Sequence, residues 1–443
     1  MAEAAAKRAA PAGGGGGSIC AADRLSALPD DLLLHIVSFL PAQHAVQTTA
    51  LSKRWVDLWR SAPCINLDLT HFRKSPYEHW RDTSVRMEAF VSKLLMLHKA
   101  SCLDSFNLTA SYADHDSLRH IHAWMRHAIR GDPKVIKVRT MCFYGYDLLY
   151  QLPHLGSSNP TCRRLTSLKL TGVSLDNSFT ELFHSAAWPH LADVVLVQCQ
   201  LAFPRIESER LKILGFQYCT APAAEVFVIR APRLASLSMS LHSNSCAKGV
   251  VLDMGSPLVR ASVSLKRDEF SARNEAILLG SLCNVTSLEI RDFQAMAILD
   301  TELFDKLPVF NNLRNLALNP FSVDDTISDE HNSFKALGRF LQKTPNMETL
   351  TLENFWVAPT VELVEIPGLQ NLRTLILDTC DLDDNFGLLQ YYLLNSPNLE
   401  KLIAQYCKVS DGSKEMESPK MVSLHYPKLK SELKFYGRNA SIP

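Results

Sequence analysis

The densest patterned apolar segment near the start of the chain runs from Asp23 to Pro63, and its spacing is helical. Pro29 suits the first position of a helix, where its missing N–H costs nothing, and Asp30 and Asp31 add negative charge to the first turn. Pro41 ends this helix, because the residue before a proline disfavours the α region. Its apolar residues share one broad face: Leu32, Leu33, Ile36, Val37, Phe39 and Leu40.

Two more short helices are predicted before Pro63. One covers Gln43 to Leu51, and the other starts at Ser52, a good N-cap, and runs through Trp55 and Trp59. Three helices of this length bury little surface, and their apolar content exceeds what they can hide among themselves. The pattern alone leaves two interpretations about even: a module that buries one face against another protein, or a cap packed on its own domain.

The remainder of the chain repeats one form: apolar, two variable, apolar, one variable, apolar, two variable, then Cys, Phe or a small residue. This is the leucine-rich repeat pattern, which places the apolar positions on a short strand. Stacked repeats give a curved parallel sheet with outer helices, and the variable strand positions line its concave face. Two early candidates, at Leu103 and Val135, stay open. The other copies start at Leu165, Leu191, Leu211, Leu234, Leu258, Val285, Leu313, Met347, Leu372 and Leu399.

One step between repeats is long. It carries the polar insert NPFSVDDTISDEHNSF before Lys335, and an insert of this kind maps to a loop on one face of the array. Three later segments have the apolar spacing of the outer helices. They begin at Leu303, Phe334 and Phe386.

The 11 cysteines are scattered without a CxxC pair, which indicates reduced and mostly buried thiols in a chain without a secretory signal. Cys199, Cys219, Cys380 and Cys407 share one repeat position, where the chain turns inward after the strand. A small polar side chain there can bond to the backbone, so a structural role is favoured over metal binding or catalysis.

Charge and hydropathy narrow the class of protein. Lys plus Arg and Asp plus Glu both number 46, so a nucleic-acid surface is not expected. No apolar run is long enough to cross a bilayer. Residues 1–22 are Ala/Gly-rich and predict a disordered tail. These features predict a soluble intracellular protein, in the nucleus, the cytoplasm or both.

No catalytic constellation is evident, because the chain has no GxGxxG before a helix, no P-loop, no HExxH and no GxSxG. The segment Asp114 to His127 holds four histidines, but no two are spaced i, i+4 as helix-borne metal ligands are. We interpret it as a solvated helix face with Ile121, Trp124 and Met125 turned inward. The sequence therefore predicts a protein that is not an enzyme and has no metal and no cofactor.

Several short motifs in the helical segment resemble an F-box, in the form common among plant F-box proteins with leucine-rich repeats, including FBD-related ones. They are Leu28-Pro29, Phe39-Leu40-Pro41, and Leu51-Ser52-Lys53-Arg54-Trp55 with Leu58-Trp59. The resemblance implies docking onto a Skp-type adaptor and, through it, a cullin and a RING protein. The adaptor-binding residues it implies are Leu28, Pro29, Leu32, Ile36, Leu40, Pro41, Val46, Leu51, Trp55, Leu58 and Trp59.

Together these features predict an α/β fold with a short three-helix F-box followed by a leucine-rich-repeat solenoid. The expected boundaries are a tail at 1–22, the F-box at 23–63, a connecting strand and helix at 64–101, the solenoid at 102–408 and a C-terminal tail at 409–443. The expected function is substrate recognition in a Skp–cullin–F-box ubiquitin ligase. The alternative is a scaffold that binds the adaptor without directing ubiquitination.

The target protein is expected to contact variable positions of the repeats. No nucleic acid and no membrane is expected as a partner, and the target itself is unknown. The positions expected from repeat geometry are Thr166, Ser167, Lys169, Arg314, Asn315, Glu348, Thr349, Arg373 and Thr374.

Overall fold

The structure is a computed structural model of the whole chain. The predicted tail at 1–22 and the polar segment SDGSKEMESPK lie outside the residues it describes. The described residues are 25, 28–112, 115–142, 150–151, 162–184, 188–222, 226–241, 249–253, 258–265, 271–293, 296–320, 327–355, 368–380, 387–407 and 430–435.

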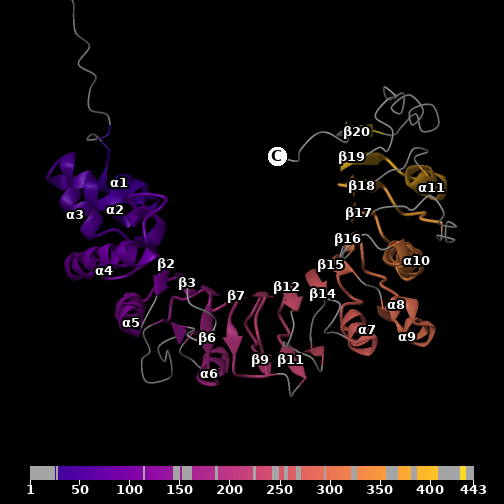
Figure 1. Ribbon diagram of the computed structural model, residues 1–443, viewed down its shortest axis with the longest axis horizontal. Helices are drawn as coiled ribbons and strands as arrows, with labels where there is room; N and C mark the ends of the chain where they lie inside the picture. The colour runs from indigo at the N-terminus through magenta and orange to yellow at the C-terminus, as the bar shows by residue number, and fades with distance from the viewer. Residues whose placement is uncertain are drawn as a thin grey trace, which may run out of the picture.

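Three short α-helices and one 3-10 turn form the N-terminal module (Figure 1). Pro29 is the N-cap of the first helix, one place before the first helical position predicted for it, and Pro41 is the N-cap of the second, which begins at Ala42 and ends at Gln47 instead of Leu51. Ser52 does not cap the third helix, because the N-cap is Lys53 and no side chain bonds there. The elements are α1 (Asp30–Ser38), α2 (Ala42–Gln47), η1 (Thr48–Ala50) and α3 (Arg54–Arg60).

A short connection joins this module to the rest of the chain. It consists of the strand β1 (Cys64–Asp68), the 3-10 turn η2 (Leu69–Phe72) and the helix α4 (Trp80–Leu97). The strand β1 is the first strand of the large sheet, so the connection and the repeats form one continuous structure.

The repeats build one 14-stranded sheet in which every pairing is parallel. Its strands line the inside of an arc, with the N-terminal module at one end (Figure 1). Both early repeat candidates are strands of this sheet. After β1, its strands are β2 (Ser105–Tyr112), β3 (Val135–Cys142), β5 (Ser167–Thr171), β7 (Asp193–Val197), β10 (Ile213–Gln217), β12 (Ser236–Leu241), β14 (Arg260–Leu265), β15 (Ser287–Phe293), β16 (Asn315–Pro320), β17 (Thr349–Glu353), β18 (Thr374–Asp378), β19 (Lys401–Cys407) and β20 (Lys430–Phe435).

Helices cover most of the outer side of the arc, as predicted (Figure 1). The middle repeats differ, because they carry short outer strands that pair into two small sheets. The helices are α5 (His115–Arg130), α6 (Ser178–His184), α7 (Ala272–Ser281), α8 (Met296–Leu299), α9 (Thr301–Lys306), α10 (Ile327–Gln342) and α11 (Gly387–Asn395). The small sheets are β4 (Tyr150–Gln151), β6 (Val173–Leu175) and β8 (Gln200–Leu201), and β9 (Arg205–Glu207), β11 (Phe227–Arg230) and β13 (Val250–Asp253).

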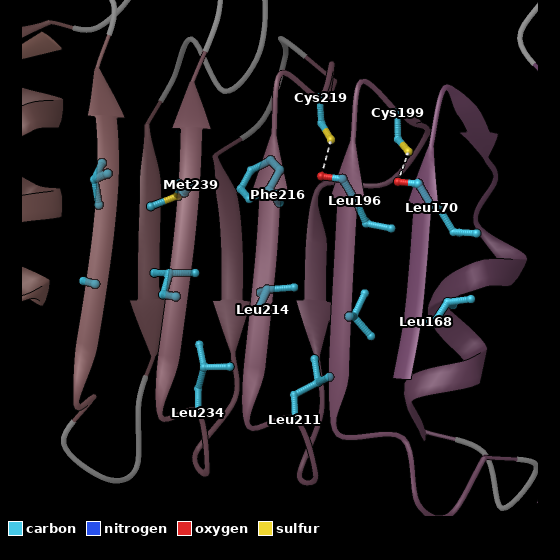
Figure 2. Close-up of a cluster of buried hydrophobic side chains, with 14 of the residues drawn as sticks. Leu168, Leu170, Leu196, Cys199, Leu211, Leu214, Phe216, Cys219, Leu234 and Met239 are labelled. Carbon is cyan, nitrogen blue, oxygen red and sulfur yellow. Dashed lines mark hydrogen bonds between the residues drawn. The ribbon is translucent and has the colours of Figure 1, made fainter. Parts of the chain in front are cut away.

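The strands β5, β7, β17 and β18 alternate between half-buried and buried side chains, which is the pattern of a sheet with one covered face. The pairing is in phase, so Leu350, Leu375 and Leu402 lie side by side across three strands, each fully buried. Each such leucine contributes about 2 kcal/mol by leaving water. The leucine positions of the sequence motif therefore make one continuous core (Figure 2).

The chain leaves about half of the strands of the large sheet through a residue with positive φ. Gln198, Tyr218, Asn354, Thr379 and Tyr406 have φ between 51° and 56°, and each directly precedes the Cys or Phe of its repeat. Gly172, with φ of 70°, takes the same place after β5. This left-handed residue turns the next side chain inward.

The repeat cysteines bond to the backbone as the sequence predicts. The thiol of Cys199 donates to the carbonyl of Leu170 at 3.6 Å and that of Cys219 to Leu196 at 3.4 Å (Figure 2). Cys380 and Cys407 make the same contact to Leu352 and Leu377, at 3.3 and 3.5 Å. Each thiol thus ties its turn to the preceding strand.

Two segments differ from the sequence-based expectation. Residues 430–435, within the predicted C-terminal tail, form β20 and pair with β19. The second half of the polar insert is not a loop, because α10 begins at Ile327 and runs through Lys335. Residues 321–326 of the insert lie outside the described part of the chain.

Candidate protein-docking surfaces

The core of the N-terminal module is filled by few side chains. Leu33 and Val37 of α1 pack inward, and so do Trp55, Leu58 and Trp59 of α3. Arg54 ties the two helices together, since its Nε donates to Asp30 Oδ1 at 2.7 Å and its Nη2 to the carbonyl of Leu28 at 2.7 Å. These side chains fill the core of the module, and its other large apolar side chains are not needed there.

The remaining large apolar side chains of the module face outward. On α1 and its C-cap, Leu32 is 50% exposed, Ile36 40% and Phe39 72%. Spacings of four and three residues put these three on one side of the helix. Leu51, at the C-cap of η1, is 61% exposed, and Leu25 is 41% exposed. We call Leu32, Ile36 and Phe39 the apolar face of the module.

The structure separates the predicted adaptor-binding residues into three groups. Pro29, Leu32, Ile36 and Leu51 are exposed. Trp55, Leu58 and Trp59 are buried, so their place is the supporting core rather than the surface. The half-buried ones are Leu28, Leu40, Pro41 and Val46.

Phe39 is the surface residue that the sequence-based selection missed. It sits in the Phe39-Leu40-Pro41 motif and was placed on the same face as the buried residues. The structure turns it outward at the end of α1, where the His35 ring packs edge-on at 4.9 Å between centroids. A signal was available, because the proline at position 41 ends the helix and exposes the residue at its C-cap.

A polar ladder joins the module to the first two sheet strands. The side-chain amide of Asn66 on β1 donates to the carbonyls of Ser38 and Leu40 at the end of α1, at 2.8 and 3.1 Å. Asn107 on β2 donates in turn to Asn66 Oδ1 at 2.6 Å. These bonds satisfy carbonyls that the helix end leaves open and hold the module in a fixed orientation to the sheet.

Two histidines lie at the same junction. A ring nitrogen of His98 bonds to the carbonyl of Ala62 at 3.0 Å, and its ring lies 6.3 Å from that of His127 on α5. Burial lowers the pKa of His98. The pKa of His127 is also lowered, first by burial and then by the nearby His98 and Arg130.

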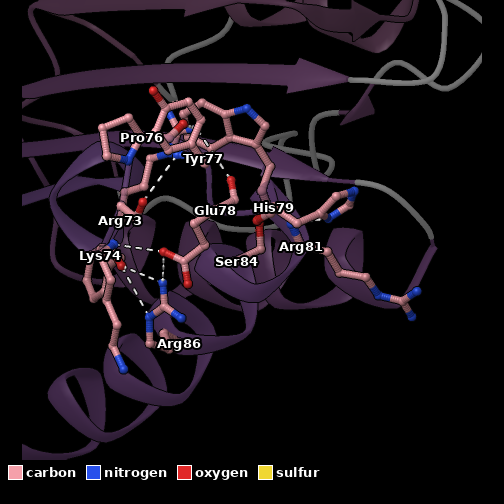
Figure 3. A network of polar contacts seen from close by, with 12 residues as sticks. Arg73, Lys74, Pro76, Tyr77, Glu78, His79, Arg81, Ser84 and Arg86 are labelled. Carbon is pink, nitrogen blue, oxygen red and sulfur yellow. Dashed lines mark hydrogen bonds and ion pairs between the residues drawn. The ribbon is translucent and has the colours of Figure 1, made fainter.

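A network of polar contacts fixes the loop between η2 and α4 (Figure 3). Arg86 on α4 pairs with Glu78 at 2.6 Å and donates to the carbonyl of Phe72 at 2.8 Å. The hydrogen bond from Arg86 holds the pKa of Glu78 below its usual range. The Arg73 guanidinium stacks 4.4 Å from the Trp80 ring centroid. These contacts hold the loop in place between the 3-10 turn η2 and the helix α4.

The predicted target-binding residues lie along the concave side but do not form one cluster. Ser167 and Lys169 are half-buried on β5, and Thr166 just before them is exposed. The other six belong to the repeats of β16, β17 and β18, and five strands, β7, β10, β12, β14 and β15, separate the two groups. At the strand spacing of a sheet this is about 29 Å.

Ion pairs between neighbouring repeats engage three residues of the second group. Arg314 pairs with Glu348 and Arg373 with Glu400, both at 3.5 Å. Asn315 and Glu348 are exposed, whereas Thr349 and Thr374 are half-buried on the concave face. Whether any of the nine contacts a target stays a prediction.

The helix α5 matches its predicted packing. Ile121, Trp124 and Met125 are buried against the sheet, and His120 is exposed. Among the residues that the structure describes, no group of three or more histidine, cysteine, aspartate or glutamate side chains is placed to hold a metal ion. No helix of that same part is both long and apolar enough to span a membrane.

Fold and surface together define a class: a leucine-rich-repeat solenoid with a helical docking module at its N-terminal end. The family model of the F-box domain matches residues 25–66. An F-box/FBD/LRR-repeat protein of Arabidopsis thaliana is 34% identical over 51% of this chain and 50% of its own length. The chain thus spans about half the length of that relative.

Two further relatives match over longer stretches. The MEIOTIC F-BOX protein MOF of Oryza sativa subsp. japonica is 29% identical over 75% of this chain and 71% of its own length. A second F-box/FBD/LRR-repeat protein of Arabidopsis thaliana is 25% identical over 92% of this chain and 95% of its own. The F-box match, the repeats and these relatives support a plant-type F-box protein with leucine-rich repeats, related to the FBD group.

Proposed function

We propose that the chain is the substrate-recognition subunit of a Skp–cullin–F-box ubiquitin ligase, active in the nucleus, the cytoplasm or both. The F-box docks a Skp-type adaptor, which connects it to a cullin and a RING protein, and the solenoid holds the target. The chain performs no chemistry in this role. It raises the effective concentration of the target beside the ubiquitin-conjugating enzyme.

The observation that carries the proposal is the apolar face of the F-box. Leu32, Ile36 and Phe39 remain in water although the core beneath them is complete. An apolar cluster that folding does not need is the mark of a protein interface. The Asn66 ladder supports the proposal as well, because a fixed orientation between docking module and repeats keeps a bound target at a constant place in the complex.

The proposal is tested by purifying the tagged full chain from plant cells and probing for the Skp-type adaptor and the cullin. We expect the wild type to retain both and the double variant Leu32→Asp with Ile36→Asp to lose both. The matched control is Met96→Asp, which changes an 85% exposed apolar residue on α4, outside the F-box. A folded wild type that retains neither protein contradicts the proposal.

A further inference from the structure

Three cationic side chains lie together on the concave face, near the F-box end of the sheet. Lys137 and Arg139 are exposed outward positions of β3, and Lys169 is the outward position of β5. The register places Lys137 directly opposite Lys169, and Arg139 opposite Thr171. We call Lys137, Arg139 and Lys169 the basic patch.

The basic patch is only partly neutralised. Lys169 Nζ lies 3.7 Å from Asp193 Oδ2, an oxygen that also accepts the Ser167 hydroxyl at 2.7 Å. Lys137 and Arg139 make no side-chain hydrogen bond or ion pair to any residue in the described part of the chain. Like charges directly opposite each other on neighbouring strands destabilise a sheet, so the fold itself gains nothing from this arrangement.

Several charged side chains farther along the same face bond to other side chains of the protein. Arg291 donates to Glu289 at 2.6 Å, Asn319 to Glu353 at 3.2 Å, and Gln405 to Asp378 at 3.2 Å. The basic patch is therefore a local group of three positive charges, of which only Lys169 has an acidic partner in the described part of the chain.

We propose that the basic patch is the docking site for an acidic segment of the target protein, with carboxylate or phosphate groups as its ligands. The spacing supports an extended segment. Outward residues two apart on a strand are about 6.6 Å apart, and neighbouring strands are about 4.8 Å apart. Alternate acidic residues of an extended chain repeat at about that 6.6 Å, so one can meet Lys137 and the next Arg139.

A nucleic acid fits this surface less well than an acidic peptide. Binding to a phosphate backbone draws on many cations, and here there are three. The chain has no net charge, and Glu353 and Asp378 lie farther along the concave face, where they repel a polyanion that follows the sheet. A short acidic segment would contact the basic patch without reaching Glu353 or Asp378.

The basic patch lies close to the F-box end of the sheet. β3 is the third strand from the F-box end in the order β1, β2, β3, so a bound segment lies about 10 Å from the strand that anchors α1. This inference rests on the proposed function only in taking the ligand to be part of a ubiquitination target. Peptide binding itself does not depend on the adaptor.

The test measures binding of three fluorescent peptides to the full chain: a poly-glutamate peptide, the same peptide with phosphoserines, and a poly-lysine peptide. Anisotropy at about 50 mM and about 200 mM NaCl separates ionic from other binding. We expect both acidic peptides to bind and to weaken with salt, with the tighter one naming the natural ligand chemistry. The charge-reversed variant K137E/R139E/K169E should weaken that binding at least about tenfold.

The matched control is Arg260→Glu, which reverses one exposed outward cation on β14 of the same face and should change binding by less than about twofold. The neutral variant K137Q/R139Q/K169Q should keep the wild-type melting temperature while losing affinity, which separates lost binding from lost folding. No binding by the wild type, equal losses in the variant and the control, or binding of a single-stranded RNA oligomer alone overturns the inference. Adaptor binding measured on the same preparations tests the proposed function separately.

Discussion

The residues with positive φ that follow repeat strands share no common side-chain chemistry. Gln198, Tyr218, Asn354 and Thr379 all hold positive φ, yet only asparagine is well suited to that region. The leucines and cysteines of the repeats could be predicted because burial selects for them directly. The turning residues could not, since the strands on both sides impose their conformation.

One of these positions has a glycine, and its replacement should be costly. At Gly172, with φ of 70°, a Cβ atom would lie 2.3 Å from the carbonyl oxygen of Thr140. We expect Gly172→Ala to lower the free energy of unfolding by about 2 kcal/mol or more. Urea denaturation measures this. The control is Gly280→Ala, where the nearest atom is 3.9 Å away and no loss is expected; equal losses would contradict the assignment.

At the element scale, the helix α1 shows how far an apolar pattern can be interpreted. The sequence placed six apolar residues on one broad face, and the structure divides them between two. Leu33 and Val37 fill the core, while Leu32, Ile36 and Phe39 face solvent. The spacing of apolar residues cannot tell the two faces apart, because a face that packs on the core and a face that binds a partner protein are both apolar. The sequence therefore predicted the helix but not which of its apolar residues face solvent.

This division predicts different effects for neighbouring residues. Val37→Asp buries a charge and should destabilise the F-box by about 3 kcal/mol or more. Ile36→Asp should change the unfolding free energy by no more than about 0.5 kcal/mol, because residue 36 already faces water. Thermal denaturation followed by limited proteolysis of the N-terminal module distinguishes the two. Similar destabilisation by both would place Ile36 in the core.

The junction between F-box and solenoid should depend on pH. The pKa values of His98 and His127 are lowered in the fold, so the unfolded chain binds protons first as the pH falls. Their contribution to stability is complete above the ordinary histidine pKa of about 6.5 and is lost as the pH falls through the folded values.

We therefore expect the melting temperature to fall more steeply below about pH 6.5 in the wild type than in His98→Gln, which keeps a donor for the Ala62 carbonyl but does not titrate. Melting curves across this range, recorded in one buffer series, provide the measurement. Identical slopes for the two proteins would show that His98 does not carry the effect.

For the whole molecule, the sequence predicted a repeat solenoid behind an F-box, and the structure confirms that class. The motif spacing sufficed because every repeat buries the same three positions. The strand β20 was missed, since the segment around it lacks the repeat form, and so were the short outer strands of the middle repeats. These strands are only two to four residues long, and only stacked neighbouring repeats provide their pairing.

The stacked architecture predicts that damage stays local. Leu316 on β16 is buried, and Leu316→Ala should cost about 2 to 5 kcal/mol in that region. Hydrogen exchange should quicken in β15, β16 and β17 and remain unchanged in β5 and β7, because each repeat contacts only its neighbours. The control Asn315→Ala alters the exposed adjacent position. Uniformly faster exchange along the sheet would contradict this description.

We propose that the apolar face of the F-box binds a Skp-type adaptor, and an equilibrium dissociation constant tests this most directly. Calorimetry with the purified chain and adaptor should show binding that Ile36→Asp and Phe39→Asp each weaken by about 30-fold or more, the effect of losing an interface hot spot. Val85→Asp, at a 57% exposed apolar residue of α4, should leave the constant unchanged. Equal affinities for all four proteins would contradict the claim.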